Sequence, residues 1–405
     1  MKSPPPTELL AALCHVVSTV ACTISSETDI SPGGSAMAAW PYPVIDCDGH
    51  LIESISELAE HLDPELRAAV LNPSREREGA FPSIDGFHGP RIQSASDHKP
   101  VREYVTASDE RKGSGEDFLG FVDKAGLEQA ILFTSEGLSV GFIQSADYAV
   151  RICRAYNDYV YHRYRRLSDR LYPMALIPFQ DPTAAVQELR RAVTELKLPG
   201  AMVPSTGLPL HLGHELYWPI YKEATDLDCV LGFHGGSALG VGMDTFSNFA
   251  AVGGMHHSLG LLQGLAAMIG HGVMERYPGL RVGFFEGGCA WLVLLLDRLE
   301  RNESVRGSTA HGGLFDCLER GRILIGCEGN DGSLPYLAKR VGPAPFAWAS
   351  DYPHEVDLVA ARQMIDETIH STELSEEDKR GALGENARRF FKLPVLAAEL
   401  SAASR

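Results

Sequence analysis

The chain is organised around the heptapeptide Val44-Ile45-Asp46-Cys47-Asp48-Gly49-His50, in which apolar residues are interleaved with two carboxylates before an imidazole. On an extended backbone, residues i and i+2 point to the same side, so Asp48 and His50 would present an oxygen and a nitrogen ligand to one point. Such a pair suits a divalent cation such as Zn²⁺ or Mn²⁺. The alternative is that the two aspartates begin a loop and that His50 lies on the surface.

After this stretch, short apolar runs alternate with helical segments. Seven further strands are expected, at 129–133, 171–177, 200–203, 229–233, 280–285, 322–326 and 346–349. Buried parallel strands joined by helices are typical of α/β proteins, and eight such units predict a closed (β/α)8 TIM barrel. A doubly wound open sheet is the alternative. In a barrel the active site lies at the carboxyl ends of the strands, so the residues that follow each strand are the candidates for chemistry.

Three regions of the 405-residue chain depart from this pattern. Residues 1–40 are predicted to be a disordered or mis-annotated N-terminal extension, because residues 25–39 are rich in Ser, Gly and Ala. Met37 is the alternative start. The barrel is predicted at 41–395 with an inserted polar loop at about 72–115, which is expected to act as a lid. Residues 396–405 would form a C-terminal tail.

The other strand ends supply partners for the first motif. Two glycines follow both His234, after the fifth strand, and Glu286, after the sixth, and Asp351 follows the eighth. We expect one divalent metal ion, zinc or manganese, held by Asp48, His50, His234 and Asp351. Glu286 would lie beside it as a proton shuttle. Taken singly, each residue has a structural alternative: a hydrogen-bonded histidine, a turn-forming aspartate, or a glutamate at a helix N-terminus.

Two longer sequence motifs are more specific than the single residues named so far. They are Gly272–Gly288, which reads Gly-Val-Met-Glu-Arg-Tyr-Pro-Gly-Leu-Arg-Val-Gly-Phe-Phe-Glu-Gly-Gly, and Ser350–Glu355, which reads Ser-Asp-Tyr-Pro-His-Glu. With the first motif and His234-Gly-Gly, they resemble the amidohydrolase superfamily from about Val44 to Leu393. The branch resembled is that of aminocarboxymuconate-semialdehyde decarboxylase and related hydrolases. The resemblance implies a barrel with one divalent metal at the four positions named above.

The chain departs from this branch at two positions. The decarboxylases usually have His-x-His or Glu-x-His at the first motif, and they have a histidine where this chain has Glu286. His257 would supply the missing imidazole, although its neighbour His256 competes for that role and helix packing is the alternative. Two reactions therefore stay open, with Glu286 or His257 handling the proton: non-oxidative decarboxylation of a small, for example aromatic, acid, or hydrolysis by metal-activated water.

Three residues are predicted to bind substrate. They are Glu53, which lies three residues after His50, the aromatic residue Trp291, and His354 in the last motif. Phe87 and Trp348 would join Trp291 in an apolar pocket. The alternatives are that Glu53 is an acid in the first turn of a helix, where acids are favoured, and that the aromatic residues pack in the core.

Two other classes are kept as alternatives. Gly137-Leu138-Ser139-Val140-Gly141 fits G-x-S-x-G and suggests a serine esterase that uses Ser139. In α/β-hydrolases, however, the oxyanion loop precedes the nucleophile, whereas the similar His234-Gly-Gly-Ser string follows it here. A non-catalytic barrel is the third class, and the presence of all four metal ligands argues against it.

Composition narrows the partners to a small-molecule substrate. The formal net charge of −17 argues against nucleic acid, and no run of 18 uncharged apolar residues predicts a membrane span. Eight cysteines without a C-x-x-C pair indicate a reduced, cytoplasmic protein. The sequence leaves a homo-oligomer open.

Overall fold

The computed structural model describes residues 40–71, 80–82, 114–243, 245–246, 249–306, 310–329, 331–354 and 356–396. The chain divides into two units, 1–38 and 39–405, and the second contains all of the described residues. Most of the predicted extension, the inserted loop and the C-terminal tail lie outside the described residues, as does Phe87.

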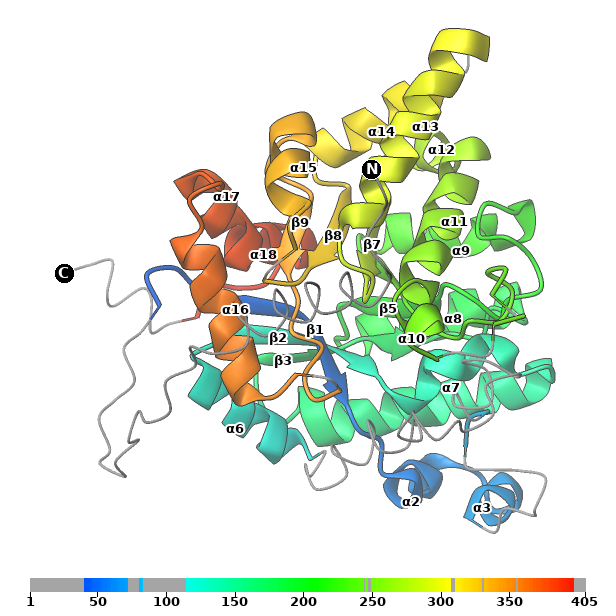
Figure 1. Ribbon diagram of the computed structural model, residues 1–405. Coiled ribbons are helices and arrows are strands. Elements are labelled where there is room, and N and C mark those ends of the chain that lie inside the picture. Colours follow the sequence, from blue (N-terminus) through cyan, green and yellow to red (C-terminus); the bar gives the residue numbers. More distant parts are fainter. Residues whose placement is uncertain are drawn as a thin grey trace, which may run out of the picture. The chain divides into compact units, whose positions relative to one another are not determined.

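The strands all pair in parallel and surround a common axis (Figure 1). They are β1 (Ile45–Leu51), β2 (Gln129–Thr134), β3 (Leu171–Pro173), β4 (Ala175–Leu176), β5 (Gly200–Pro204), β6 (Val230–His234), β7 (Arg281–Phe285), β8 (Ile323–Cys327) and β9 (Phe346–Trp348). β3 and β4 form one barrel strand interrupted at Met174, whose N–H donates to the carbonyl of Leu132 in β2 at 2.8 Å. The eight predicted strands are therefore all present.

The sheet closes between its first and last strands. The N–H of Asp351 donates to the carbonyl of Asp48 at 2.8 Å, and the N–H of His50 donates to the carbonyl of Tyr352 at 2.7 Å. Asp46, buried in β1, adds a second link, because its carboxylate accepts the N–H of Ser350 at 3.0 Å and the hydroxyl of Ser350 at 2.6 Å. Closure confirms the barrel and excludes the open sheet.

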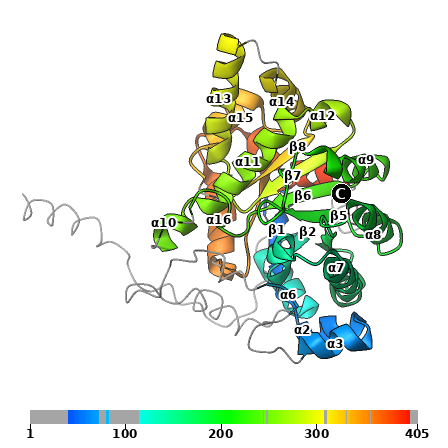
Figure 2. The ribbon, with the colours of Figure 1, turned by 90° about the vertical axis from the view of Figure 1, so that its right-hand side faces the viewer.

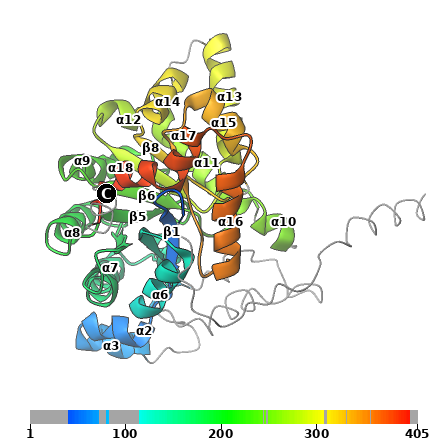
Figure 3. The ribbon, with the colours of Figure 1, turned by 90° about the vertical axis from the view of Figure 1, so that its left-hand side faces the viewer.

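Helices surround the strands on the outside (Figures 2 and 3). The α-helices are α2 (Ile55–Leu58), α3 (Pro64–Leu71), α6 (Gly115–Ala125), α7 (Ala146–Val160), α8 (Pro182–Thr194), α9 (Trp218–Asp226), α10 (Phe249–Gly253), α11 (His256–Gly270), α12 (Val273–Arg276), α13 (Ala290–Arg306), α14 (Ala310–Glu319), α15 (Leu334–Val341), α16 (Leu358–His370), α17 (Glu376–Arg380) and α18 (Asn386–Phe391). Shorter 3₁₀ or π turns are η1 (Ala59–His61), η2 (Glu136–Phe142), η3 (Tyr161–Arg165), η4 (Glu215–Tyr217) and η5 (Gly381–Glu385).

Local sequence explains where these helices begin and end. Ser114 forms a capping box with Asp117 at the start of α6, and Asp181 caps α8 directly before Pro182. Gly272 adopts a φ of 69° and separates α11 from α12, so the largely apolar run before β7 forms two helices where its sequence alone is compatible with one. Within the described residues, no helix is long and apolar enough to cross a membrane.

The barrel interior supports the strand ends with aromatic side chains. The ring of Phe133 lies 4.8 Å from the ring of His234 and 5.0 Å from the ring of Phe285. Gly232 leaves room for it, because a Cβ there would lie 3.0 Å from the Phe133 ring. The predicted site therefore stands on an apolar floor that excludes water from below.

Candidate active site

The first motif lies at the end of β1 as the sequence predicts. Asp48 Oδ1 and His50 Nε2 are 3.6 Å apart, and both residues are almost completely buried. The Nδ1–H of His50 donates to the carbonyl of Thr134 at 3.0 Å, so Nε2 carries the lone pair that points toward Asp48. Burial lowers the pKa of His50 well below its ordinary value. His50 is thus a neutral imidazole, the form that ligates metals.

Two further predicted ligands reach the same point from other strands. His234 Nε2, at the end of β6, lies 3.0 Å from Asp48 Oδ1. Asp351 Oδ1, three residues after β9, lies 3.5 Å from His50 Nε2. Potential ligand atoms of Asp48, His50 and His234 lie within 4.8 Å of one another, and Asp351 shares a second such group with His50, Glu286 and His354. His50 belongs to both groups.

The donor set fits a cation. Among the described residues, Asp48 Oδ2 and His50 Nε2 are buried polar atoms without a hydrogen-bond partner. Each such atom normally costs about 1–3 kcal/mol, more when the group is charged. A divalent ion coordinated by these atoms would remove that cost. Two carboxylate and two imidazole ligands also match the preferences of zinc and manganese.

The backbone is constrained at the two carboxylates that close the site. Glu286 has a φ of 60° and Asp351 a φ of 55°, in the left-handed region that non-glycine residues rarely adopt. Such conformations cost about 1–3 kcal/mol and persist only where the surroundings enforce them. At Asp351 the hydrogen bond from its N–H to Asp48 provides that enforcement.

Glu286 lies between two histidines. Its Oε2 is 3.1 Å from Nδ1 of His234 and 3.3 Å from Nδ1 of His257, which projects from the first turn of α11. Gly235 makes this approach feasible, because a Cβ there would lie 2.2 Å from His257 Nδ1. Burial raises the pKa of Glu286, and the charge of His234 opposes that rise. The predicted pair of proton carriers, Glu286 and His257, is therefore in contact.

His354 lies beside His50 and Asp351, and its ligand atom is within 4.8 Å of a carboxylate oxygen of Glu286. Its ring lies 4.0 Å from the ring of His50, and its Nδ1 is 3.0 Å from Asp351 Oδ1. Its Nε2 is 2.8 Å from Ser135 Oγ, which itself donates to the carbonyl of Leu51 at 2.9 Å. Burial lowers the pKa of His354, but the charge of Asp351 outweighs it and raises the pKa to about 9. His354 therefore carries a positive charge beside the predicted ligands.

Glu53 and Trp291 have structural contacts. The Glu53 carboxylate accepts N–H groups of Ser135 at 3.2 Å and Glu136 at 3.1 Å, and it also accepts the hydroxyl of Thr134. It therefore fixes the turn after β2. The indole N–H of Trp291 donates to the carbonyl of Gly288 at 2.9 Å, and the buried ring packs against Phe284. A role of Glu53 or Trp291 in binding substrate stays a prediction.

The esterase alternative lacks its machinery among the described residues. Ser139 is buried in η2, and its hydroxyl donates to the carbonyls of Pro82, at 2.6 Å, and Glu136, at 3.2 Å. A nucleophilic serine would instead donate to a base, most often a histidine. This geometry gives Ser139 a structural role.

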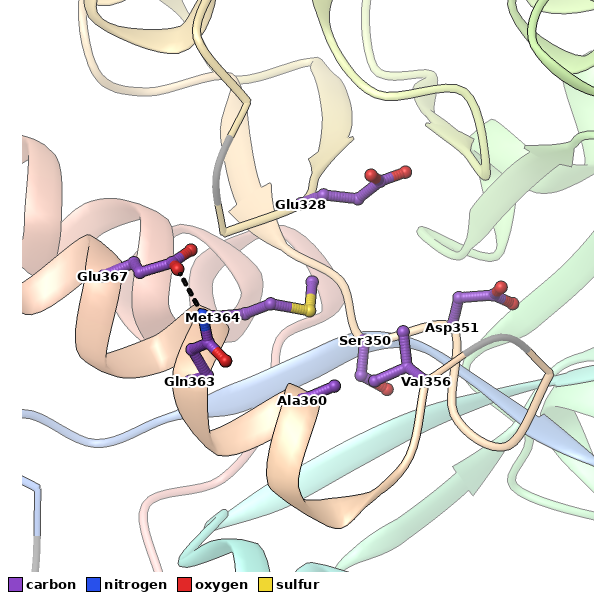
Figure 4. Close-up of a pocket in the computed structure, with 8 residues that line it drawn as sticks. All are labelled: Glu328, Ser350, Asp351, Val356, Ala360, Gln363, Met364 and Glu367. Carbon is purple, nitrogen blue, oxygen red and sulfur yellow. Dashed lines mark hydrogen bonds between the residues drawn. The ribbon is translucent and has the colours of Figure 1, made fainter. Parts of the chain in front are cut away.

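A pocket of about 340 Å³ opens beside Asp351, between the ends of β8 and β9 and helix α16 (Figure 4). Its lining residues are Glu328, Ser350, Asp351, Val356, Ala360, Gln363, Met364 and Glu367. Figure 4 shows the carboxylates of Glu328 and Asp351 pointing in the same direction. Sequence reasoning missed Glu328, although its position directly after β8 repeats the pattern of the other strand ends. It also assigned no role to Thr134 or Ser135, which follow the same rule at β2.

Comparison with known proteins identifies the family of the chain. The amidohydrolase family model matches residues 45–393. Gamma-resorcylate decarboxylase from Polaromonas sp. is 24% identical over 67% of this chain and 85% of that protein. The 2-amino-3-carboxymuconate-6-semialdehyde decarboxylase of Dictyostelium discoideum is 26% identical over 60% of this chain and 67% of that protein.

Solved structures share the fold. An amidohydrolase from Mycobacterium avium subsp. paratuberculosis has a TM-score of 0.66 at 19% identity, with 89% of this chain and 100% of that chain covered. A 5-carboxyvanillate decarboxylase from Novosphingobium aromaticivorans, solved with bound manganese, has a TM-score of 0.62 at 21% identity and covers 87% of this chain and 98% of that chain. The predicted barrel, superfamily and enzyme class, a metal-dependent hydrolase or carboxy-lyase, are confirmed. The chain belongs to the amidohydrolase family.

Proposed function

We propose that this chain is a metal-dependent decarboxylase that removes CO₂ from a small, oxygen-substituted aromatic acid without a redox step. The observation that carries the proposal is the convergence of Asp48, His50, His234 and Asp351, with two buried donor atoms unpaired among the described residues. The curated relatives named above are decarboxylases, which favours this reaction over other chemistry of the family.

We assign the four converging residues as the ligands of one divalent ion. Manganese is bound in three of the solved structures that share the fold, and zinc fits the same donor set. When bound, the ion would polarise the substrate carboxylate and a neighbouring oxygen. His354, held by Asp351 and Ser135, would add a second positive charge for the substrate carboxylate.

Glu286 and His257 would supply the proton. Decarboxylation breaks the bond from the ring carbon to the carboxylate, releases CO₂ and leaves an electron pair on carbon that one proton must neutralise. Glu286 is in contact with His257, whose side chain is 20% exposed, so a proton lost to carbon can be replaced from solvent through the imidazole. Glu286 thereby takes the place that a histidine has in the decarboxylase branch.

The pocket beside Asp351 shares that one residue with the proposed ligands and has room for a small ring. Its volume of about 340 Å³ lies at the lower end of small-molecule sites. Suitable probes are 2,6-dihydroxybenzoate and 5-carboxyvanillate, the acids named for enzymes of the same fold. Both place an oxygen near the carboxylate that leaves.

The test combines metal content with product analysis. Protein purified without chelator or a histidine tag would be analysed by plasma mass spectrometry, together with His234→Ala and Asp351→Asn. We expect that each variant lacks about one zinc or manganese ion per chain that the wild type holds, whatever zinc is bound elsewhere, and that one of the probes releases CO₂ in a metal-dependent reaction. Equal metal content in the wild type and both variants after addition of Zn²⁺ and Mn²⁺ would overturn the proposal.

Hydrolysis is the second candidate, and the carboxylate of Glu286 favours it. A carboxylate beside a metal centre can take a proton from water and pass it to a leaving group. A panel of amides, esters and lactones, assayed in parallel with the acids, separates the two. Turnover of a neutral substrate without CO₂ release would replace the decarboxylase assignment.

We also propose that the enzyme works in a reducing compartment, the cytoplasm. All six cysteines among the described residues are free and buried. Cell fractionation with an antibody tests this, and recovery outside the cytoplasm would contradict it. Light scattering of the purified protein would establish whether it forms a homo-oligomer.

A further inference from the structure

A second group of metal-ligating side chains lies outside the proposed active centre. Cys289 comes from the turn between β7 and α13, Cys327 from the end of β8, and Asp331 from the segment before α15. The two sulfur atoms and one carboxylate oxygen of Asp331 all lie within 4.8 Å of one another. Both thiols are buried, with 0% and 2% exposure.

The spacing suits coordination with little movement. A tetrahedral zinc ion with ordinary bond lengths sets its ligand atoms roughly 3.6–3.8 Å apart. The donors here would have to approach one another by at most about 1 Å, which χ rotations of two cysteines can supply. Three protein ligands would leave the fourth position for water.

Asp331 is held in place by the backbone. Its Oδ2 accepts the N–H of Cys289 at 2.6 Å, and its Oδ1 accepts the N–H of Ser333 at 3.2 Å. Each carboxylate oxygen has a further lone pair, so these bonds do not consume its capacity as a ligand. The turn is closely packed against it, because a Cβ at Gly288 would lie 2.9 Å from Asp331 Oδ2.

We propose that Cys289, Cys327 and Asp331 form a second metal site, specific for a thiophilic divalent cation such as Zn²⁺ or Cd²⁺. Two sulfur donors select against manganese and magnesium, which prefer oxygen ligands. This site is independent of the proposed decarboxylation and goes beyond it.

Binding is an acid–base exchange without electron transfer. Each thiol forms a sulfur–metal bond and gives up its proton, so one divalent ion releases two protons. In the metal-free protein the hydrogen bond with Cys327, together with burial, raises the pKa of the Cys289 thiol and keeps it protonated. An occupied site would fix the turn that also carries Glu286, three residues before Cys289.

Cadmium titration of the full chain tests the site, because thiolate-to-cadmium charge transfer absorbs in the ultraviolet. The proposed active centre contains no sulfur ligand, so cadmium bound there gives no such band. We expect a band that saturates with one thiolate-bound ion per chain and a release of two protons at that site. The variant Asp351→Asn, which lacks a ligand of the other centre, should keep the band.

Three variants decide the outcome. Cys289→Ser and Cys327→Ser should each abolish most of the band, whereas the control Cys153→Ser, a buried cysteine of α7, should keep it. Denaturant unfolding of each variant would check that it is folded. No band in folded wild-type protein with excess cadmium, or an undiminished band in Cys289→Ser, would overturn the proposal.

Discussion

Substitution of Gly235 by alanine tests the contact between Glu286 and His257. A Cβ at residue 235 would lie 2.2 Å from His257 Nδ1 and 2.7 Å from Glu286 Oε2, whereas ordinary contacts begin at 3.4 Å. Since 3.4 minus 2.2 is 1.2, the imidazole must retreat by about 1.2 Å. The φ of Gly235 is not left-handed, so alanine fits the backbone, and the three atoms nearest the new Cβ all belong to these two side chains.

The expected effect on turnover follows from that displacement. A misplacement of about 1 Å in a catalytic group lowers the rate on the order of 10²-fold, which corresponds to about 2.7 kcal/mol. The stability cost of overpacking should be about 1–3 kcal/mol, which the chain tolerates if its stability is ordinary. Because the three atoms nearest the new Cβ belong to His257 and Glu286, metal content should stay at the wild-type level.

Steady-state kinetics on the substrate found for the wild type would measure kcat, while mass spectrometry measures metal and urea denaturation measures stability. Gly120→Ala is the matched control, since a Cβ there meets nothing within 4 Å in the middle of α6. It should leave kcat unchanged and stabilise the protein by about 0.5–1 kcal/mol. A folded, metal-loaded Gly235→Ala enzyme with wild-type kcat would refute the assignment of Glu286 and His257 as proton carriers.

Three further predictions address other residues of the site. Asp351→Asn should lower metal affinity by at least about tenfold, as measured by competition with a chromogenic chelator; an unchanged affinity would remove Asp351 from the ligand set. Burial raises the pKa of Glu53 to about 7, so the folded state holds its proton more tightly than the unfolded state. Stability should therefore fall by up to about 3 kcal/mol as the pH rises from about 4.5 to 7, and Glu53→Gln should flatten that slope in urea titrations; an unaltered slope would contradict it. Ser139→Ala should keep full activity and lose about 1 kcal/mol of stability with the bond to Pro82, whereas loss of activity together with labelling by a fluorophosphonate would revive the esterase.

The sequence predicts this barrel well because each strand is a short apolar run buried on both faces. Periodicity cannot show that β3 and β4 form one interrupted strand, since Met174 is as apolar as its neighbours and the break is a matter of hydrogen bonding. The sequence also cannot show that the helix breaks at Gly272, because a single glycine is compatible with a continuous helix. Closure between β1 and β9 depends on pairing across some 300 residues, which no local pattern encodes.

The same distinction applies to the residues of the site: some of their contacts could be predicted from local sequence, and others only from the folded structure. Residues at or shortly after strand ends, such as His234 and Asp351, could be predicted to converge because parallel strands end at one edge. The partners of Glu53 could not be predicted. They are Thr134 and Ser135, in the turn after β2, and only the structure shows that Glu53 reaches this turn. The pairing of Cys289 with Cys327 likewise required the structure, since 38 positions and two helices separate them.

Two buried carboxylates that take no part in the proposed chemistry explain how the centre keeps its shape. Asp46 ties β1 to Ser350 beyond β9, and Glu53 ties the end of β1 to the turn after β2. Burial raises the pKa of both Asp46 and Glu53 to about 7, because removing each carboxylate from water costs free energy. A gain in stability alone therefore does not explain why these two carboxylates are buried. Their hydrogen bonds specify position: β1, which supplies Asp48 and His50, is fixed on both sides at the seam where the barrel closes. A metal centre needs ligands placed to within a fraction of an ångström, and these two links provide that precision on the strand that bears two of its four ligands.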